Sequence, residues 1–362
     1  MRILLLGEYS NVHATLAKGL RRLGHEVTVA SNGDFWKDYP RDTDLSRHPG
    51  RWGGLLLMAK VMGQLPRWRC YDIVQLINPL FIELAASRIT PVYHYLRRHN
   101  RRVVLGAFGM DYYWVRSCVE DKVLRYSDFN IGNRLRTDAD ALRERADWLG
   151  TDKETLNRLV ATTCDSIVAG LYEYWVSYQP LFPDKTCFIP YPIEMPAMKP
   201  RPFDGILRLF IGINKQRDTY KGTDVMLAAA EAVAARHPGK VELRVARSVP
   251  FAEYQRLMEG SDALLDQLYS YTPSMNPLLA MSKGIICIGG GEPEHYNLLG
   301  EHQLRPIVNV EPFYESVAAA LENLLAHPEH IDRMKQESIE YVRRHHEFIS
   351  VAKRYEAMYK RL

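Results

Sequence analysis

The sequence predicts an α/β protein of two domains, each built on a mostly parallel sheet. Short apolar runs of strand character alternate with helical stretches along the chain, a succession typical of βαβ units. At 362 residues the chain exceeds the size of one ordinary hydrophobic core. A proline-rich stretch between residues 190 and 205 separates two such series, which indicates two domains joined by a linker.

The first series covers residues 1–190, which we assign to an N-terminal domain. It opens on the apolar run Arg2–Leu6, a pattern typical of a buried parallel strand, followed by an amphipathic helix over Ala14–Leu23 that Gly24 ends. The later strands of this half are expected at Glu26–Ala30, Asp72–Ile77, Arg102–Ala107, Asp165–Ala169 and Thr186–Ile189.

Residues 191–205 form the expected hinge. Five prolines lie between residues 190 and 202, and proline continues neither a helix nor a central strand, because it lacks an amide proton and its backbone angle is fixed. The C-terminal domain, residues 206–330, has strands expected at Leu207–Ile211, Val241–Val245, Ala263–Leu268, Ile285–Ile288 and Pro306–Val310. Helices are expected at Thr223–Arg236, Phe251–Glu259, Pro277–Lys283, Tyr314–Ala326 and Ile331–Lys360, the last in a separate segment, 331–362.

Composition narrows the class of protein. Hydrophobic residues make up 46% and charged residues 25%, as in a globular protein. The net charge of +4 gives little reason to expect nucleic-acid binding. The five cysteines are odd in number and have no C-x-x-C spacing, which favours a reducing compartment and disfavours a zinc site.

The N-terminal apolar run is too short for a signal peptide, since Glu8 interrupts it, and no later run approaches the roughly 20 residues that span a bilayer. We therefore expect a cytoplasmic protein. Basic clusters such as Arg67 and Arg69 beside Trp68 leave two interpretations open, a solvated helix face and a peripheral contact with the inner face of the membrane.

Cationic residues follow the first strand of the C-terminal domain. In an open α/β sheet, ligands bind at the carboxyl ends of the strands. Lys215, Arg217 and Lys221 lie in this position and are suited to an anionic diphosphate, which arginine grips through two hydrogen bonds and lysine holds as a point charge. The alternative is a solvated basic loop before a helix.

A helix N-terminus is the second candidate anion site. Ser274, Met275 and Asn276 precede the short helix, with Asn276 a suitable cap, Pro277 suited to the first helical position and Ser274 an alternative cap. Free amide groups and the helix dipole bind anions there without a charged side chain. The alternative is a well-capped structural helix.

A glycine-rich loop with carboxylates follows a later strand. Gly290 and Gly291 allow close approach of the backbone to a ligand, although glycines also simply make a turn. Glu294 is suited to accept hydrogen bonds from sugar or ribose hydroxyls, and Glu292 is an alternative. Either is equally well explained as a solvated loop carboxylate.

With these residues in place, the chain resembles the GT-B glycosyltransferases, specifically the large retaining group of family 4. The resemblance extends over almost the whole length. It is carried by Arg2–Leu6 with Leu23–Val29, by the hinge motif Phe188–Glu194, by the pair Lys221–Gly222 and by the loop Gly290–Glu294.

The resemblance implies two Rossmann-like domains facing a cleft, with the final helix crossing back to the N-terminal domain. It also places Ser274–Asn276 at the diphosphate-binding helix. The chain departs from the family where two spaced glutamates are usual, since Tyr271 and Leu279 stand there. Asp266, at a strand end, is a candidate replacement for ribose recognition.

In the N-terminal domain the resemblance points to the acceptor side. Many inverting GT-B enzymes place a general-base histidine after the first strand, paired with an aspartate from a later strand. Asn11 and His13 occupy that loop, and Asp111 is the candidate partner. His13 has a structural or capping role as its alternative. Tyr112 is suited either to stacking on a sugar or to packing in the core.

The predicted function is transfer of a sugar from a nucleotide-diphosphate donor to a saccharide or lipid-linked acceptor. By resemblance, the reaction is retaining and belongs to bacterial surface-polysaccharide synthesis. No metal or other cofactor is expected, because Lys, Arg and a helix end suffice for the diphosphate. The alternatives are a nucleotide-sugar epimerase and a degenerate GT-B protein that binds a saccharide or serves as a scaffold. An oxidoreductase is disfavoured, since no G-x-G-x-x-G follows the first strand.

Overall fold

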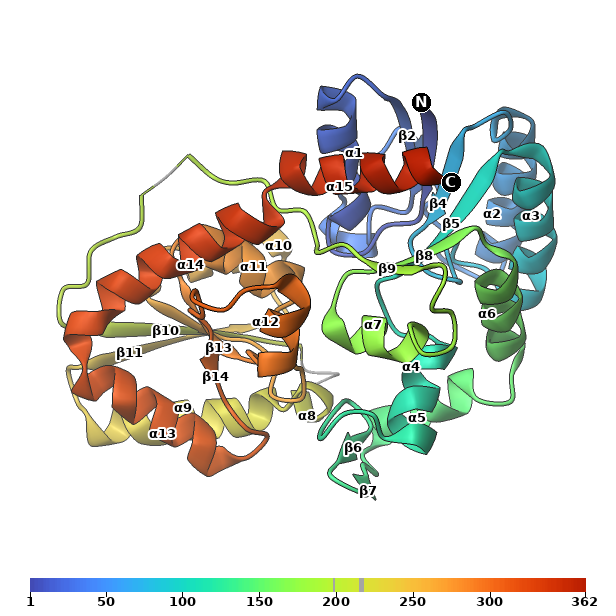
Figure 1. Cartoon of the computed structure of the whole chain (residues 1–362). Coiled ribbons are helices and arrows are strands. Elements are labelled where there is room, and N and C mark those ends of the chain that lie inside the picture. Colours follow the sequence, from blue (N-terminus) through green and yellow to red (C-terminus); the bar gives the residue numbers. More distant parts are fainter. Residues whose placement is uncertain (198, 215–217) are drawn as a thin grey trace. The chain divides into compact units, whose positions relative to one another are not determined.

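The computed structural model describes residues 1–197, 199–214 and 218–362, and the chain divides into two compact α/β units (Figure 1). Unit 1 comprises Met1–Val123, Arg143–Pro192 and Phe348–Leu362. Unit 2 comprises Leu124–Leu142 and Ile193–Glu347. The predicted fold class is confirmed, because each unit contains one parallel sheet with helices packed against it.

The sheet of unit 1 has seven parallel strands in the order β3-β2-β1-β4-β5-β8-β9. The central strand β1 pairs with β2 and β4, with Leu4 opposite Thr28 on one side and Val74 on the other. Helices cover both faces, which is why the central strands are almost wholly apolar. The strands are β1 (Arg2–Leu6), β2 (Glu26–Ser31), β3 (Thr43–Asp44), β4 (Ile73–Leu76), β5 (Arg102–Ala107), β8 (Ser166–Ala169) and β9 (Thr186–Phe188).

The helices of unit 1 include the first and the last of the chain. In order they are α1 (Val12–Arg22), α2 (Gly53–Gln64), α3 (Ala86–His99), α4 (Tyr112–Arg116), α6 (Asp152–Thr163), α7 (Tyr172–Tyr178) and α15 (Phe348–Arg361). Shorter helical turns are η1 (Phe35–Lys37), η2 (Leu65–Arg67) and η3 (Ser117–Asp121), and α5 (Ala139–Trp148) crosses the unit boundary. Helix α15 packs on α1 at Gly19, where a Cβ would lie 2.8 Å from the Phe348 carbonyl oxygen.

The sheet of unit 2 has five parallel strands in the order β11-β10-β12-β13-β14. Along β10, Leu209 and Ile211 enter one hydrophobic cluster while Phe210 enters the cluster on the opposite face, as the two-residue period of a strand requires. The strands are β10 (Leu207–Ile213), β11 (Val241–Arg247), β12 (Ala263–Leu265), β13 (Ile286–Gly289) and β14 (Val308–Asn309). The helices are α8 (Asp218–Lys221), α9 (Thr223–Arg236), α10 (Phe251–Met258), α11 (Met275–Ser282), α12 (Pro293–Leu299), α13 (Tyr314–Ala326), η4 (Pro328–His330) and α14 (Ile331–His346).

A segment from the first half of the chain belongs to unit 2. Residues 124–142, expected in the N-terminal domain, contain the antiparallel pair β6 (Asn130–Ile131) and β7 (Arg134–Leu135) and pack with residues of unit 2. The Arg136 guanidinium donates to the carbonyl oxygens of Thr219 at 2.8 Å and Tyr220 at 2.9 Å. Residues 124–142 therefore belong to unit 2, although their position in the sequence falls within the first domain.

The expected final helix is two helices. The carbonyl of His346 accepts a hydrogen bond from the Ile193 amide at 2.6 Å, and the parallel bridge between Ile193 and Glu347 interrupts the helix there. Helix α14 packs against α11 within unit 2, so α15 alone returns to the N-terminal unit. In the part of the chain that the structure describes, no helix has both the length and the apolar character needed to cross a bilayer.

Candidate functional site

Loops of unit 2 converge at the carboxyl edge of its sheet. Lys221 follows β10, and its carbonyl oxygen accepts a hydrogen bond at 2.9 Å from the amide of Leu268, which follows β12. Gly222 makes this contact possible, because it has a φ of +69° and a Cβ there would lie 2.6 Å from the Leu268 side chain. The Asp266 amide in turn donates to Ile288 of β13 at 3.0 Å. Backbone hydrogen bonds thus join the segment after β10 to the loop after β12, and this loop to strand β13.

Asp266 and Lys221 interact electrostatically at this edge. Burial raises the pKa of the Asp266 carboxyl to about 6, while the positive charge of Lys221 acts in the opposite direction. A carboxyl group with such a pKa is suited to hydrogen bonding with hydroxyl groups in either protonation state. Lys215 and Arg217, the other predicted cations, lie outside the described residues.

Helix α11 begins two residues earlier than expected, at Met275 instead of Pro277. The cap position belongs to Ser274, the alternative cap, so the expectation that Asn276 caps the helix is wrong. The Asn276 side chain instead donates to the Tyr254 hydroxyl at 2.7 Å. The Ser274 side chain makes no cap hydrogen bond, and the first helical bond runs from the Leu278 amide to the Ser274 carbonyl.

Two backbone amides of this first turn therefore have no acceptor within the helix. Amides at the start of a helix lack an intrahelical partner, and Pro277 has no amide proton. The amides of Met275 and Asn276 remain, at the positive end of the helix dipole. Such an arrangement is a ready-made binding site for an anionic oxygen.

The glycines of the β13 loop serve the packing of the loop itself. A Cβ on Gly290 would lie 1.9 Å from the Ser270 carbonyl oxygen, and one on Gly291 would lie 2.8 Å from the Ile307 side chain. The Gly291 amide donates to the Asn309 side chain at 2.8 Å. The close packing of Ser270 and Ile307 therefore requires glycine at positions 290 and 291, whether or not a ligand also approaches the loop.

Both glutamates of this loop bind one arginine. Arg125 donates to Glu292 and to Glu294 through different nitrogens of its guanidinium group. Glu292 is buried and also accepts hydrogen bonds from the Tyr126 hydroxyl at 2.6 Å and from the Asn309 side chain at 3.2 Å. The alternative interpretation of the two glutamates as solvated loop carboxylates is therefore wrong, since both belong to an ion-pair network with Arg125.

Sequence reasoning missed Arg125, Tyr126 and Arg136. All three come from residues 124–142, and they hold the two loops that carry Lys221 and Glu294. The one available signal is Tyr271, which stands where the resembled family has a glutamate. Its buried hydroxyl accepts a hydrogen bond from the Arg125 amide at 2.7 Å, and the Arg125 guanidinium lies 5.0 Å from its ring.

In unit 1, His13 is fully buried and both ring nitrogens are engaged. Nδ1 lies 2.8 Å from the Gly7 carbonyl oxygen, which makes it the donor, and Nε2 accepts from the Gln75 amide group at 3.1 Å. Burial lowers the pKa of His13 to about 3, so the ring is neutral. Gln75 in turn accepts from the Tyr359 hydroxyl of α15 at 2.6 Å. These contacts agree with the alternative that His13 has a structural role.

Asp111 is bonded to groups other than His13. Its carboxylate accepts from the Trp114 amide at 2.9 Å, which caps α4, and from the Tyr178 hydroxyl at 2.7 Å. Burial raises its pKa to about 7. The expected histidine–aspartate pair is therefore not formed. Tyr112 is buried, and its hydroxyl accepts a hydrogen bond from Arg158, which agrees with the interpretation that Tyr112 packs in the core.

A further buried carboxylate, Glu8, lies directly after β1. It accepts hydrogen bonds from the amides of Ala14 at 2.8 Å and His13 at 3.2 Å, so it caps α1 where Asn11 makes no side-chain cap. Burial raises its pKa to about 8. Asn11 itself has a φ of +74° and is partly exposed. Glu8, rather than Asn11, thus organises this turn.

The structure of the chain is similar to known structures, although its sequence matches no family model and no curated protein. HepE of Anabaena, solved with UDP and glucose, aligns with 13% identity and a TM-score of 0.62 over 100% of both chains. Sucrose-phosphate synthase of Thermosynechococcus elongatus aligns with 12% identity and a TM-score of 0.65 over 100% of this chain and 99% of the other.

A third structure is similar over its full length. The lipopolysaccharide outer core galactosyltransferase WaaB aligns with 12% identity and a TM-score of 0.53 over 100% of both chains. Together with the two parallel sheets of seven and five strands, these alignments show that the chain has the GT-B fold.

Proposed function

We propose that this protein is a glycosyltransferase that takes its sugar from a nucleotide-diphosphate donor. The observation that carries the proposal is the meeting of Lys221, Asp266 and the loop leading to α11 at the carboxyl edge of the unit 2 sheet. Proteins of the same fold have been solved with UDP or with UDP and glucose, which supports a donor of this class.

In the proposed reaction the bond between the sugar C1 and the β-phosphate oxygen breaks, and the acceptor oxygen bonds to C1. The acceptor hydroxyl releases its proton to solvent, and the nucleoside diphosphate departs with an added negative charge. Lys221 and the first-turn amides of Met275 and Asn276 stabilise that charge, a contribution that is often the largest in catalysis. Lys215 and Arg217 are proposed to add to it.

The hydroxyl-rich part of the donor requires acceptors of hydrogen bonds. Asp266 is proposed to receive hydroxyls of the ribose or sugar, since it lies beside Lys221 with a raised pKa. Glu294 keeps one carboxylate oxygen without a partner while the other binds Arg125, so it is a second proposed contact. Neither role needs a metal ion or a cofactor.

The finer parts of the function remain proposals that rest on the resemblance. They are a hexose as the transferred group, retention of configuration, a saccharide or lipid-linked acceptor, and a place in surface-polysaccharide synthesis at the inner face of the membrane. Asp111 and Glu8, both buried with raised pKa values, are the groups of unit 1 suited to a proton-linked role on the acceptor side. His13, Asn11 and Tyr112 are proposed to shape that region.

The decisive experiment is incubation with a panel of nucleotide-diphosphate sugars and mixed glycan acceptors, followed by measurement of nucleoside diphosphate release. We expect release from at least one donor, dependent on an acceptor. Conversion of the donor without an acceptor would instead identify an epimerase. Failure of every donor either to bind or to react would contradict the proposal.

A non-catalytic saccharide-binding protein is the second candidate. It is favoured by Tyr271 and Leu279 at the glutamate positions of the resembled family, and by the engagement of Glu292 and Glu294 with Arg125. Calorimetric titration separates the two candidates. A scaffold binds saccharide without releasing nucleoside diphosphate, whereas the enzyme binds the diphosphate itself.

A further inference from the structure

The positive charge of the chain is concentrated in one stretch. Residues 45–71 contain five basic residues and no Asp or Glu. This stretch contributes +5, whereas the whole chain carries +4, so all other residues sum to −1. The five basic residues are Arg47, Arg51, Lys60, Arg67 and Arg69.

Helix α2 lies in this stretch and has two apolar faces. Leu57 and Val61 face the core and are buried. On the other side Trp52, Leu55, Leu56, Ala59 and Met62 are exposed and follow one another at the three- and four-residue spacing of a single helix face. Trp52 is 58% exposed and Leu56 57% exposed, so the described residues leave this face uncovered.

Half of the exposed large hydrophobic side chains of the described residues come from one part of the sequence, and four of them lie on α2 or at its first turn: Trp52, Leu55, Leu56 and Met62. Of the twelve large hydrophobic side chains that are exposed in the described residues, six lie between residues 35 and 62. Soluble proteins scatter such side chains singly, and a contiguous patch marks an interaction site. The six are Phe35, Trp36, Trp52, Leu55, Leu56 and Met62.

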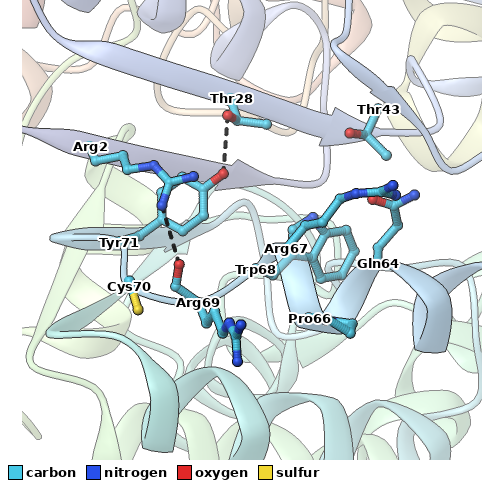
Figure 2. Close-up of a pocket in the computed structure, with 10 residues that line it drawn as sticks. All are labelled: Arg2, Thr28, Thr43, Gln64, Pro66, Arg67, Trp68, Arg69, Cys70 and Tyr71. Atoms are coloured by element: carbon cyan, nitrogen blue, oxygen red, sulfur yellow. Dashed lines mark hydrogen bonds between the residues drawn. The ribbon is translucent and has the colours of Figure 1, made fainter.

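A pocket of about 430 Å³ adjoins the C-terminal end of α2 (Figure 2). Gln64 and Pro66 at this end of the helix line it together with Arg2, Arg67 and Arg69. Arg2 binds Glu26, but Arg67 and Arg69 form no ion pair with a described residue. Arginine side chains thus line a pocket at the C-terminal end of the helix that carries the exposed apolar face.

We propose that α2 docks on the surface of a membrane that contains anionic phospholipids. The face of Trp52, Leu55, Leu56 and Met62 enters the interface between headgroups and acyl chains, where the apolar side chains of a helix that lies in the plane of the membrane are buried. Arg51, Arg67 and Arg69 bind lipid phosphates, and the pocket at the end of α2 receives one headgroup. The inference does not depend on the proposed transferase reaction.

The positive charge near α2 favours an anionic membrane over a second copy of the chain as the partner of this face. A symmetric dimer places the same patch of both copies against each other. Lys60 pairs with Asp44 and Arg47 with Glu83, so Arg51, Arg67 and Arg69 are the basic residues of the stretch without an ion pair among the described residues. A symmetric contact would bring these three positive charges of each copy within a Debye length of about 8 Å at physiological ionic strength. An anionic membrane instead offers the opposite charge and an apolar interior to the same surface.

Sedimentation with lipid vesicles tests the inference. The full chain is mixed with vesicles of phosphatidylcholine alone or with phosphatidylglycerol added, at low and high salt. We expect binding to the anionic vesicles that weakens as salt rises. Inorganic phosphate at millimolar concentration should compete little, because a free ion lacks the apolar contribution. Absence of binding to anionic vesicles would overturn the inference.

Variants separate the apolar and the charged contributions. The double substitution Leu55→Gln and Leu56→Gln should lower vesicle affinity at least tenfold. Arg67→Gln with Arg69→Gln should lower it about fivefold for each charge removed and reduce the salt dependence. The matched controls, Leu142→Gln with Leu181→Gln and Arg333→Gln with Arg343→Gln, alter exposed residues elsewhere and should bind as the unmodified chain does.

Thermal unfolding and sedimentation velocity show whether the apolar face of α2 is free in solution. Thermal unfolding of Leu55→Gln with Leu56→Gln should match the unmodified chain, and a marked loss of stability would show that this face packs within the protein. Sedimentation velocity should give the same mass for both. A dimer that disappears in this variant would assign the face to a second copy and overturn the inference.

Discussion

The carboxyl edges of the two sheets use similar topology for different chemistry. At the edge of unit 2, Lys221 and the amides of Met275 and Asn276 offer positive charge, and Asp266 lies beside Lys221. At the edge of unit 1, Glu8 and Asp111 are buried carboxyls that bind backbone amides of their own unit. The edge of unit 2 is suited to bind an anion. The edge of unit 1 instead contains two buried carboxyl groups whose pKa values are raised. Topology alone therefore does not decide the chemistry at a strand end. The side chains that follow the strands decide it, because, among the described residues, a lysine lies beside the buried carboxyl of Asp266 but not beside those of Glu8 and Asp111.

The largest expected effect concerns Asp111 and pH. Because burial raises the pKa of Asp111 from 3.8 to about 7, the folded protein keeps a proton that the unfolded chain releases at lower pH. The stability that this group contributes is therefore full below about pH 4 and is lost as pH rises to about 7. The loss approaches about 4 kcal/mol, because the two pKa values differ by about 3 and each pH unit between them corresponds to about 1.36 kcal/mol.

Asp111→Asn removes this titration but keeps a side-chain oxygen to cap α4. We expect the unmodified chain to lose more thermal stability than the variant between pH 5 and pH 8, measured by calorimetry. Asp152→Asn, at an exposed first-turn position of α6, is the control. If the thermal stability of Asp111→Asn and of the unmodified chain changed equally with pH, Asp111 would not have a raised pKa, and this difference between the two sheet edges would be wrong.

Lys221 tests the anion-binding edge. Lys221→Ala should lower the rate of nucleoside diphosphate release about 100-fold, the effect of removing one charge-stabilising donor. It should also weaken the binding of nucleoside diphosphate more than that of nucleoside. The control is Lys240→Ala, which alters an exposed lysine between α9 and β11. Equal turnover by the two variants would exclude a catalytic role for Lys221.

Arg125 tests whether residues 124–142 are part of the unit 2 edge. Arg125→Met leaves the buried carboxylate of Glu292 without its cation, and we expect a loss of about 1–2 kcal/mol in the free energy of unfolding, since the arginine is itself half exposed. Nucleoside diphosphate should bind more weakly. Arg134→Met changes an exposed arginine of β7 in the same segment and should preserve both.

The smallest effect is expected at α15. Tyr359→Phe removes the hydroxyl that donates to Gln75, the residue bound to His13, and should cost about 1 kcal/mol of unfolding free energy. Tyr95→Phe, whose hydroxyl has no hydrogen-bond partner in the described part of the chain, is the control. If Tyr359→Phe changed turnover but not stability, His13 would be more than a structural residue.

Local patterns predicted much of the fold and part of the site. The apolar runs Arg2–Leu6 and Leu207–Ile211 are strands, because continuous apolar character fits a strand covered on both faces. Lys221 follows its strand as expected, and Asp266 meets it at the same edge. Sequence spacing alone assigned the helix cap to Asn276, whereas the extended backbone that defines the cap belongs to Ser274.

Residue periodicity was enough to establish the α/β class, the two series of strands and the residues that follow each strand, because these features depend on neighbours along the chain. Long-range packing was needed to show that residues 124–142 join unit 2, that the last helical stretch is divided at Glu347, and that His13 is enclosed. Those outcomes depend on contacts such as Arg125 with Glu292, which lie 167 positions apart. No local pattern encodes a partner at such a distance, because only the packing of the whole unit brings the two side chains together.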